Sequence, residues 1–206
     1  MPAAPTLVLS TRNPHKLREF ARLMAPAGLG LEPLPGDVEL PPEDGETFAE
    51  NALPKARTAA AATGRPAIAD DSGIEALALG GIPGVRSARY AGENASDEEN
   101  LAKLLREVDA AGEDRAVAYV CAIAHVAADG GERLYFGRCE GELAREPRGT
   151  GGFGYDPAFV PADTGPDDRR TMGELSPAEK HAISHRGRAA RALARGLGLE
   201  VGAEGR

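Results

Sequence analysis

The sequence predicts an α/β fold built on a mixed sheet, and three observations carry that prediction. Short apolar runs alternate with segments whose apolar side chains recur at helical spacing. Helix-start signals precede several of those segments. Larger side chains occupy every second position of residues 117–125, and an Asp-Gly-Gly turn then leads into residues 134–143 as a hairpin partner. Alternating strands and helices together with a hairpin favour a mixed sheet flanked by helices.

The first third of the chain reads as strand, helix, loop and helix. Residues 6–10 form a short buried strand, and Asn13-Pro14 then caps and opens a helix with one apolar face. Residues 33–45 contain four prolines and several acids, which predicts an extended surface loop. Residues 47–50 form a capping box for a helix that runs to about Thr63.

The middle of the chain places acidic side chains after a strand. Residues 66–69 form a buried strand that ends at Asp70 and Asp71. Carboxylates at the end of a strand stand where α/β proteins commonly bind ligands. Residues 80–92 are rich in glycine and arginine and form a structured loop, and residues 96–99 cap the next helix.

After the hairpin come a glycine-dense loop and a terminal helix. The loop covers residues 147–161, and residues 176–179 combine a capping box with proline at the first helical position. We expect one terminal helix from there through Leu197.

Bulk properties narrow the class of protein. A chain of 206 residues fits a single domain, residues 1–206, and its 42% hydrophobic and 27% charged residues are ordinary for a soluble protein. The formal net charge of -8 disfavours binding to a nucleic acid polymer. No apolar run approaches the ~18 residues that cross a membrane, and the first residues lack a signal peptide, so we expect a cytoplasmic protein. Cys121 and Cys139 fit buried apolar side chains better than a disulfide or a zinc site.

The segment of residues 10–16 is a candidate phosphate site. Hydroxyls, an amide, backbone N–H groups and Lys16 gather there at the positive end of a helix. A plain helix cap at Asn13, with Arg12 and Lys16 in solvent, is the alternative. The sequence contains no P-loop motif.

A set of acids is a candidate magnesium site. Glu43, Glu50, Asp70 and Asp71 could supply the few hard oxygen ligands that Mg²⁺ needs beside phosphates and water. Their alternative roles are structural: Glu50 completes its capping box, and the two aspartates merely end a strand. The structural role of the two aspartates would cost free energy, because one of two adjacent acids must point inward or meet a cation.

Two further segments could hold an organic ligand. In residues 149–157, glycines allow close approach of the backbone, and Phe153 or Tyr155 offers a face for a base, although both could simply anchor a long turn. On the last helix, Lys180 to Arg186 could donate to phosphate or to a purine oxygen. His181 and His185 have the spacing of a metal pair, but a third ligand is missing from the pattern.

Taken together, these motifs strongly resemble the inosine triphosphate pyrophosphatase family, in its bacterial branch for non-standard purines. The resemblance follows the chain in order through Ser10-Thr11-x-Asn13-x-x-Lys16, Glu50-Asn51-Ala52, Ala69-Asp70-Asp71-Ser72-Gly73, Pro83-Gly84-x-x-Ser87-Ala88-Arg89-Tyr90, residues 151–157 and Ser184-His185-Arg186. It implies an elongated mixed sheet flanked by helices, two lobes with a central cleft, and a homodimer.

The resemblance also implies a reaction and roles for residues. Water attacks the α-phosphorus of dITP, ITP or XTP and releases pyrophosphate and the monophosphate, with Mg²⁺ as cofactor. Asp71 would be the catalytic base and a metal ligand, with Glu43 as a second metal ligand. The substrate-binding residues implied are Thr11, Arg12, Asn13, Pro14, His15, Lys16, Ser72, Phe153, Gly154, Tyr155, Asp156, Lys180, His185 and Arg186.

The sequence departs from the family pattern at two positions and leaves two alternatives open. Arg12 replaces a usual glycine, where it adds a phosphate contact or projects into solvent, and Arg86 replaces a common aromatic residue.

Donors aimed at the purine 6-oxo group would reject adenine, which presents an amino group there. The alternatives are a pyrimidine or modified-nucleotide pyrophosphatase of similar fold, and a nucleotide sensor without turnover.

Overall fold

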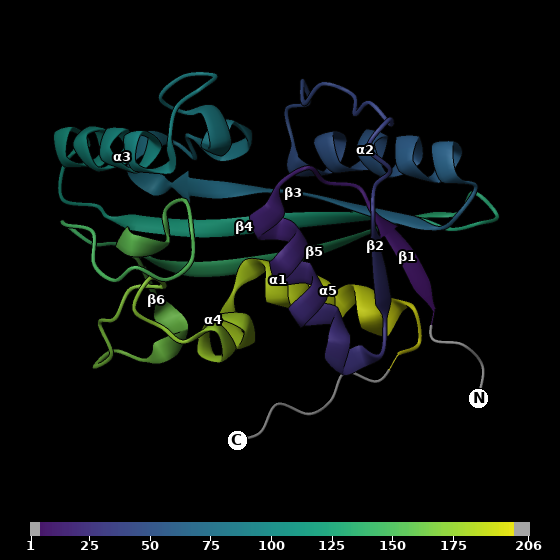
Figure 1. Ribbon diagram of the computed structural model, residues 1–206. Coiled ribbons are helices and arrows are strands. Elements are labelled where there is room, and N and C mark those ends of the chain that lie inside the picture. The colour runs from purple at the N-terminus through teal and green to yellow at the C-terminus, as the bar shows by residue number, and fades with distance from the viewer. Residues whose placement is uncertain (1–4, 200–206) are drawn as a thin grey trace. The chain divides into compact units, whose positions relative to one another are not determined.

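A computed structural model describes residues 5–199 and contains one six-stranded sheet with the order β2-β1-β3-β4-β5-β6 (Figure 1). Strand β1 pairs in parallel with β2 and with β3, whereas β5 and β6 pair antiparallel. The predicted mixed sheet flanked by helices is therefore confirmed. The strands are β1 (Thr6–Leu9), β2 (Gly30–Pro33), β3 (Ala67–Ala76), β4 (Ala116–Val126), β5 (Glu132–Leu143) and β6 (Phe159–Pro161).

Four helices begin where the sequence signals predict. Asn13 caps the first helix, and complete capping boxes at Thr47, Ser96 and Ser176 open three others. The helices are α1 (Pro14–Met24), α2 (Phe48–Thr63), α3 (Asp97–Ala111), α4 (Pro177–Ile183) and α5 (His185–Gly196).

The described chain divides into two compact units that share the long strands β3, β4 and β5. Unit 1 comprises residues up to Asp71, residues 121–137 and residues from Gly187 onward. Unit 2 comprises residues 72–120 and 138–186.

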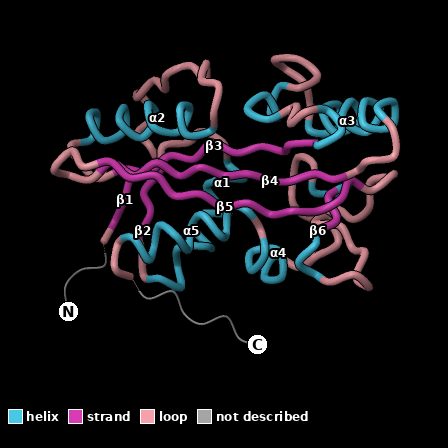
Figure 2. Tube along the Cα trace, turned by 180° about the vertical axis from the view of Figure 1, so that it is seen from behind, coloured by secondary structure: helices cyan, strands magenta, loops and turns pink. Residues whose placement is uncertain are grey.

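In unit 1 the sheet has helices on both faces, as Figures 1 and 2 show from opposite sides. Ala52 and Ala56 of α2 pack against Ala69 of β3, and these small side chains allow close approach of the helix. The adjacent Ile68 points to the other face, as expected for a strand, and packs with Phe20 of α1 and with α5. Both faces of β3 are thus covered in this unit.

Unit 2 is built around one apolar cluster. Leu104 of α3, Ile74 of β3 and Phe159 of β6 are fully buried in it. Tyr119 of β4 stacks on Phe159 with ring centroids 4.4 Å apart. Helix α3 lies on the opposite side of the strands from α4 in both views (Figure 2).

The structure corrects the predicted end of the second strand. We expected a strand that ends at Asp70 and Asp71, but β3 continues through both to Ala76. The two aspartates are therefore buried in the middle of a strand. Their burial is tolerated because cations and an amide contact them, as described below.

The structure also divides the expected terminal helix. Ser184 is extended, with ψ of 153°, so α4 ends there and α5 begins at His185. Serine side chains compete with helical hydrogen bonds, which makes Ser184 a reasonable break. His181 and His185 consequently lie on different helices, and the metal-pair hypothesis loses its geometric basis.

Two smaller expectations concern cysteines and membranes. Cys121 and Cys139 are both buried, as predicted. Among the residues that the structure describes, none of the helices combines the length and apolarity that a membrane span requires.

Candidate functional site

A cluster of buried charges lies in unit 1, where β3 passes α1 and α2. Asp70 and Asp71 are 1% and 5% exposed, respectively. Lys16 of α1 places its Nζ 2.9 Å from Oδ2 of Asp70. Lys55 of α2 donates from Nζ to the Asp70 carbonyl at 2.8 Å and to Oε1 of Glu43 at 2.5 Å. The expectation that Asp71, Lys16 and Glu43 lie in one neighbourhood therefore agrees with the structure of unit 1.

Asn51 connects the Asp71 carboxylate to the loop that carries Glu43. Its Nδ2 donates to Oδ2 of Asp71 at 2.9 Å, and its Oδ1 accepts from the backbone N–H of Gly45 at 2.8 Å. One amide thus orients the predicted base and fixes the end of the loop two residues beyond Glu43.

The electrostatics of the cluster follow from its burial. Burial raises the pKa of the Asp71 carboxyl, and Glu43 adds to that rise, while Lys55, Lys16 and the Asn51 hydrogen bond act in the opposite direction. Burial alone would lower the pKa of Lys55, but Asp70, Glu43 and Asp71 outweigh it and raise that pKa. Lys55 is consequently a fixed positive charge beside three carboxylates.

The donor set fits a magnesium ion that is bound together with phosphate. Within residues 5–199, no three acidic, histidine or cysteine side chains are arranged to hold a metal ion by themselves. Magnesium in nucleotide enzymes usually takes one or two carboxylates and completes its shell with water and substrate phosphates. The negative charge of Glu43 opposes ionisation of Asp71, and a divalent cation held by both carboxylates would relieve that repulsion.

The predicted phosphate segment turns from β1 into α1. Asn13 accepts from the backbone N–H groups of His15 and Lys16 through Oδ1, so the helix-cap alternative describes its side chain correctly. Thr11 is buried and accepts from the Asn13 N–H through Oγ1 at 3.2 Å. Pro14 is the first residue of α1, and His15 is exposed on its first turn. Lys16 is the member of this segment that contacts the acids.

Two members of this cluster were missed as site residues by the sequence analysis. Lys55 received no role, and Asn51 appeared only inside a motif. A signal was present, because the two lie four residues apart and therefore on one face of α2. The neighbouring buried residues of that face include Ala52, Ala56 and Ala59, among which a buried lysine requires a partner.

A second group of polar side chains lies in unit 2, centred on Asp156. This carboxylate is 2% exposed and accepts from the Phe153 N–H at 2.8 Å, from the Tyr119 hydroxyl at 3.2 Å and from Lys180 Nζ at 2.7 Å. Gly152 adopts a φ of +74°, and a Cβ there would lie 2.0 Å from the Asp156 carboxylate. Asp156 therefore holds the glycine loop in shape, and its own side chain is turned inward.

Phe153 offers a half-buried ring flanked by two cations. Lys180 Nζ lies 5.1 Å and Arg186 Cζ lies 5.6 Å from the centroid of the ring. Arg186 also donates to the Ser72 hydroxyl at 2.7 Å. Such a ring with adjacent donors suits an aromatic base that carries polar edge groups.

The remaining predicted residues of unit 2 have supporting positions. Tyr155 belongs to the apolar cluster and donates to the Ser87 carbonyl at 2.7 Å, so only its backbone could meet a ligand. The Gly154 N–H donates to Asp97 at 2.7 Å. His185 is buried and stacks on Tyr119 with centroids 4.5 Å apart. Arg86, the second departure from the family pattern, is exposed on a short 3-10 segment, Gly84–Arg89.

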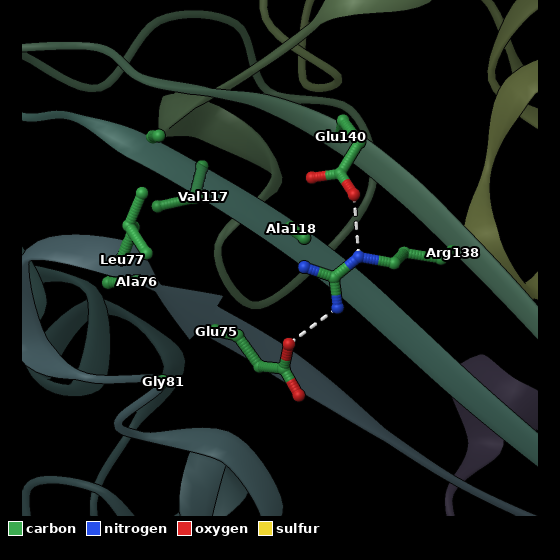
Figure 3. A pocket seen from close by; sticks show the side chains of 9 residues that line it. Glu75, Ala76, Leu77, Gly81, Val117, Ala118, Arg138 and Glu140 are labelled. Carbon is green, nitrogen blue, oxygen red and sulfur yellow. Dashed lines mark hydrogen bonds and ion pairs between the residues drawn. The ribbon is translucent and has the colours of Figure 1, made fainter.

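A separate hollow in unit 2 lies on the sheet itself. Figure 3 shows Arg138 of β5 between Glu75 of β3 and Glu140, with distances of 2.5 Å and 2.6 Å between the paired atoms. Ala118 and Val117 line the same hollow (Figure 3). The single guanidinium pairs with both carboxylates, so this hollow carries one excess negative charge.

Comparisons with known proteins show the family of the chain. The model of the Ham1 family matches residues 7–196. A dITP/XTP pyrophosphatase from Geobacter sulfurreducens is 51% identical over 199 residues, which are 94% of this chain and 97% of that protein. One from Mycobacterium tuberculosis is 52% identical and is matched over 89% of this chain and 90% of that protein.

Solved structures extend the likeness to the fold. A HAM1 protein from Coxiella burnetii aligns with a TM-score of 0.84 at 43% identity and covers 94% of this chain and 98% of its own. The Ham1 protein of Staphylococcus aureus aligns with a TM-score of 0.81 at 38% identity over the same shares. On the family match and these relatives, the chain belongs to the Ham1 family.

Proposed function

We propose that this protein hydrolyses non-standard purine nucleoside triphosphates, namely dITP, ITP and XTP, to the monophosphate and pyrophosphate. The buried Asp71 carboxylate, oriented by Asn51 beside Lys16, Lys55 and Glu43, is the observation that carries the proposal. The relatives named dITP/XTP pyrophosphatase support the substrate class.

Each group of side chains has a part in this reaction. Lys16, from the segment of residues 10–16, binds phosphate oxygens, and Glu43 and Asp71 would hold magnesium. When bound, magnesium neutralises charge on the phosphates. Asp71 orients a water molecule toward the α-phosphorus and accepts its proton. Lys55 keeps the cluster from accumulating three uncompensated negative charges.

The nucleoside is assigned to the residues around Phe153. The base stacks on the Phe153 ring, while Lys180, His185 and Arg186 complete the pocket. A buried donor that meets the 6-oxo group of hypoxanthine or xanthine would face another donor in adenine. That all of these residues contact one substrate stays a prediction.

Product analysis tests the reaction and separates it from its alternatives. With dITP, the expected products are dIMP and pyrophosphate, since the water attacks the α-phosphorus. Release of dIDP and inorganic phosphate would contradict this assignment. Equal turnover of dTTP or UTP would favour a pyrimidine or modified-nucleotide enzyme, and binding without any turnover would favour a sensor.

Replacing Phe153 by alanine should weaken substrate binding. Loss of base stacking is expected to raise the KM for dITP about tenfold, since a stacked base contributes about 1–3 kcal/mol. Steady-state kinetics on dITP measure the effect. Phe136→Ala is the matched control, because that phenylalanine is 58% exposed and belongs to unit 1. An unchanged KM in Phe153→Ala would refute the stacking role.

The assembly and compartment belong to the same proposal. We assign a homodimer, which the exposed apolar side chains of Leu77 and Ile82, at 67% and 53% exposure, support. Light scattering after gel filtration measures the mass. The cytoplasm is the proposed compartment, since the nucleotide pool is used there.

A further inference from the structure

Arg12, the first departure from the family pattern, contacts the proline-rich loop of residues 33–45. Its guanidinium donates to the backbone carbonyls of Leu34, Pro35, Gly36 and Val38, at 3.0, 2.7, 3.4 and 2.6 Å. We had expected a phosphate contact or a side chain in solvent. Instead, both Nη1 and Nη2 of Arg12 donate to backbone carbonyls of the proline-rich loop.

The same loop is anchored at two further places. Leu34 is buried, and Val38 and Leu40 pack with it against an apolar cluster that includes Val8 and Ala59. Downstream, the N–H groups of residues 45 and 46 donate to the side chains of Asn51 and Glu50 at 2.8 Å each. Arg12 therefore secures the upstream part of a loop whose downstream end is fixed to α2.

Glu43 lies between these anchors. Its carboxylate contacts Lys55, and it is 32% exposed at the side chain, so it is open to a ligand on one side. A loop without regular hydrogen bonds between residues 34 and 45 would let Glu43 sample many positions. The planar guanidinium of Arg12 contacts several carbonyls of the loop, so this one side chain restricts the positions that the loop can sample.

We propose that Arg12 is a positioning residue that holds the Glu43 loop against the segment of residues 10–16. This inference rests on the proposed function, in which that segment binds the triphosphate and Glu43 binds magnesium. Arg12 is adjacent to Thr11 and Asn13, so it joins the phosphate segment directly to the metal-ligand loop. Arg12 thereby holds Glu43, the proposed metal ligand, in a fixed position relative to the bound phosphates.

A phosphate-binding role for Arg12 makes different predictions. A phosphate contact depends mainly on positive charge, so Arg12→Lys would preserve it. A positioning role depends on the fork of the guanidinium, because a single ammonium group has three donors and cannot span four carbonyls along the loop. The conservative variant therefore separates the two roles.

The first measurement is hydrogen exchange in the substrate-free protein. In Arg12→Gln and in Arg12→Lys we expect amide exchange at Val38, whose N–H donates to the Pro35 carbonyl at 3.2 Å, to rise about tenfold, as for the loss of hydrogen bonds from a charged donor. Arg22→Gln removes an equal charge from an exposed position on α1 and serves as the control, with unchanged exchange in the loop. Exchange at wild-type rates in Arg12→Gln would overturn the inference.

The second measurement is kinetic. Both Arg12 variants should require about tenfold more Mg²⁺ for half-maximal pyrophosphate release, while the KM for dITP at saturating Mg²⁺ stays within about twofold. A raised KM that Arg12→Lys restores would assign Arg12 to phosphate binding and overturn the inference. If the unaltered enzyme releases no pyrophosphate, the proposed function itself fails, so the two failures are distinguishable.

Discussion

Asp71→Asn should abolish pyrophosphate release from dITP while the nucleotide still binds. The substitution keeps the size of the side chain and one oxygen for the Asn51 amide, which donates to Asp71 at 2.9 Å. It removes the group that accepts the proton of water, and general bases typically contribute about 10²–10⁴-fold to the rate. We expect kcat to fall about 10³-fold or more.

Isothermal titration with dITP and Mg²⁺ measures the binding that should remain. Asp44→Asn is the matched control, because it makes the same chemical change at an exposed position in unit 1 and should leave kcat within about twofold. A kcat of Asp71→Asn near the wild-type value would exclude Asp71 as the base.

Asp156→Ala should produce the largest loss of stability in unit 2. The substitution removes the partner of Lys180, and the two side chains are only 3% and 9% exposed. It also deprives the Tyr119 hydroxyl and the Phe153 N–H of their acceptor. Breaking a buried ion pair on one side costs about 3–5 kcal/mol of unfolding free energy, because the other charge stays buried and uncompensated.

Denaturant unfolding followed by circular dichroism measures this loss. Asp168→Ala is the control, since its ion pair with Arg170 is more exposed and should contribute below about 1 kcal/mol. The double variant Asp156→Ala with Lys180→Met should recover part of the loss, because the unpaired ammonium is then absent. A single variant as stable as the wild type would show that Asp156 does not organise the glycine loop.

Local signals in the sequence predicted the helices well. The helix caps form hydrogen bonds between residues at most four positions apart, so a short stretch of sequence is enough to predict them. These caps are Asn13 with Pro14 and the capping boxes that begin at Thr47, Ser96 and Ser176. The length of β3 depends on distant partners instead. Two buried aspartates continue a strand only where cations such as Lys16 and Lys55 meet them, and sequence spacing does not reveal that meeting.

The candidate site shows the same division. Glu43, Asp71 and Lys16 were candidates from their residue types and positions, the family resemblance implied their roles, and unit 1 brings them together around one strand. Lys55 and Asn51 were not predicted as site residues, because their roles depend on contacts to Asp70, Asp71 and the Glu43 loop. The contacts of Arg12 were not predicted for a related reason, since its carbonyl partners lie 22 to 26 residues away in sequence.

A purine panel tests the central claim most directly. Pyrophosphate release would be measured with dITP, ITP, XTP, ATP and GTP, each with Mg²⁺ and again with excess chelator. We predict turnover of the first three only with Mg²⁺, and kcat/KM for ATP about 100-fold lower, as a donor–donor mismatch of a few kcal/mol requires. Hydrolysis of ATP and GTP at rates similar to that of dITP would contradict the account.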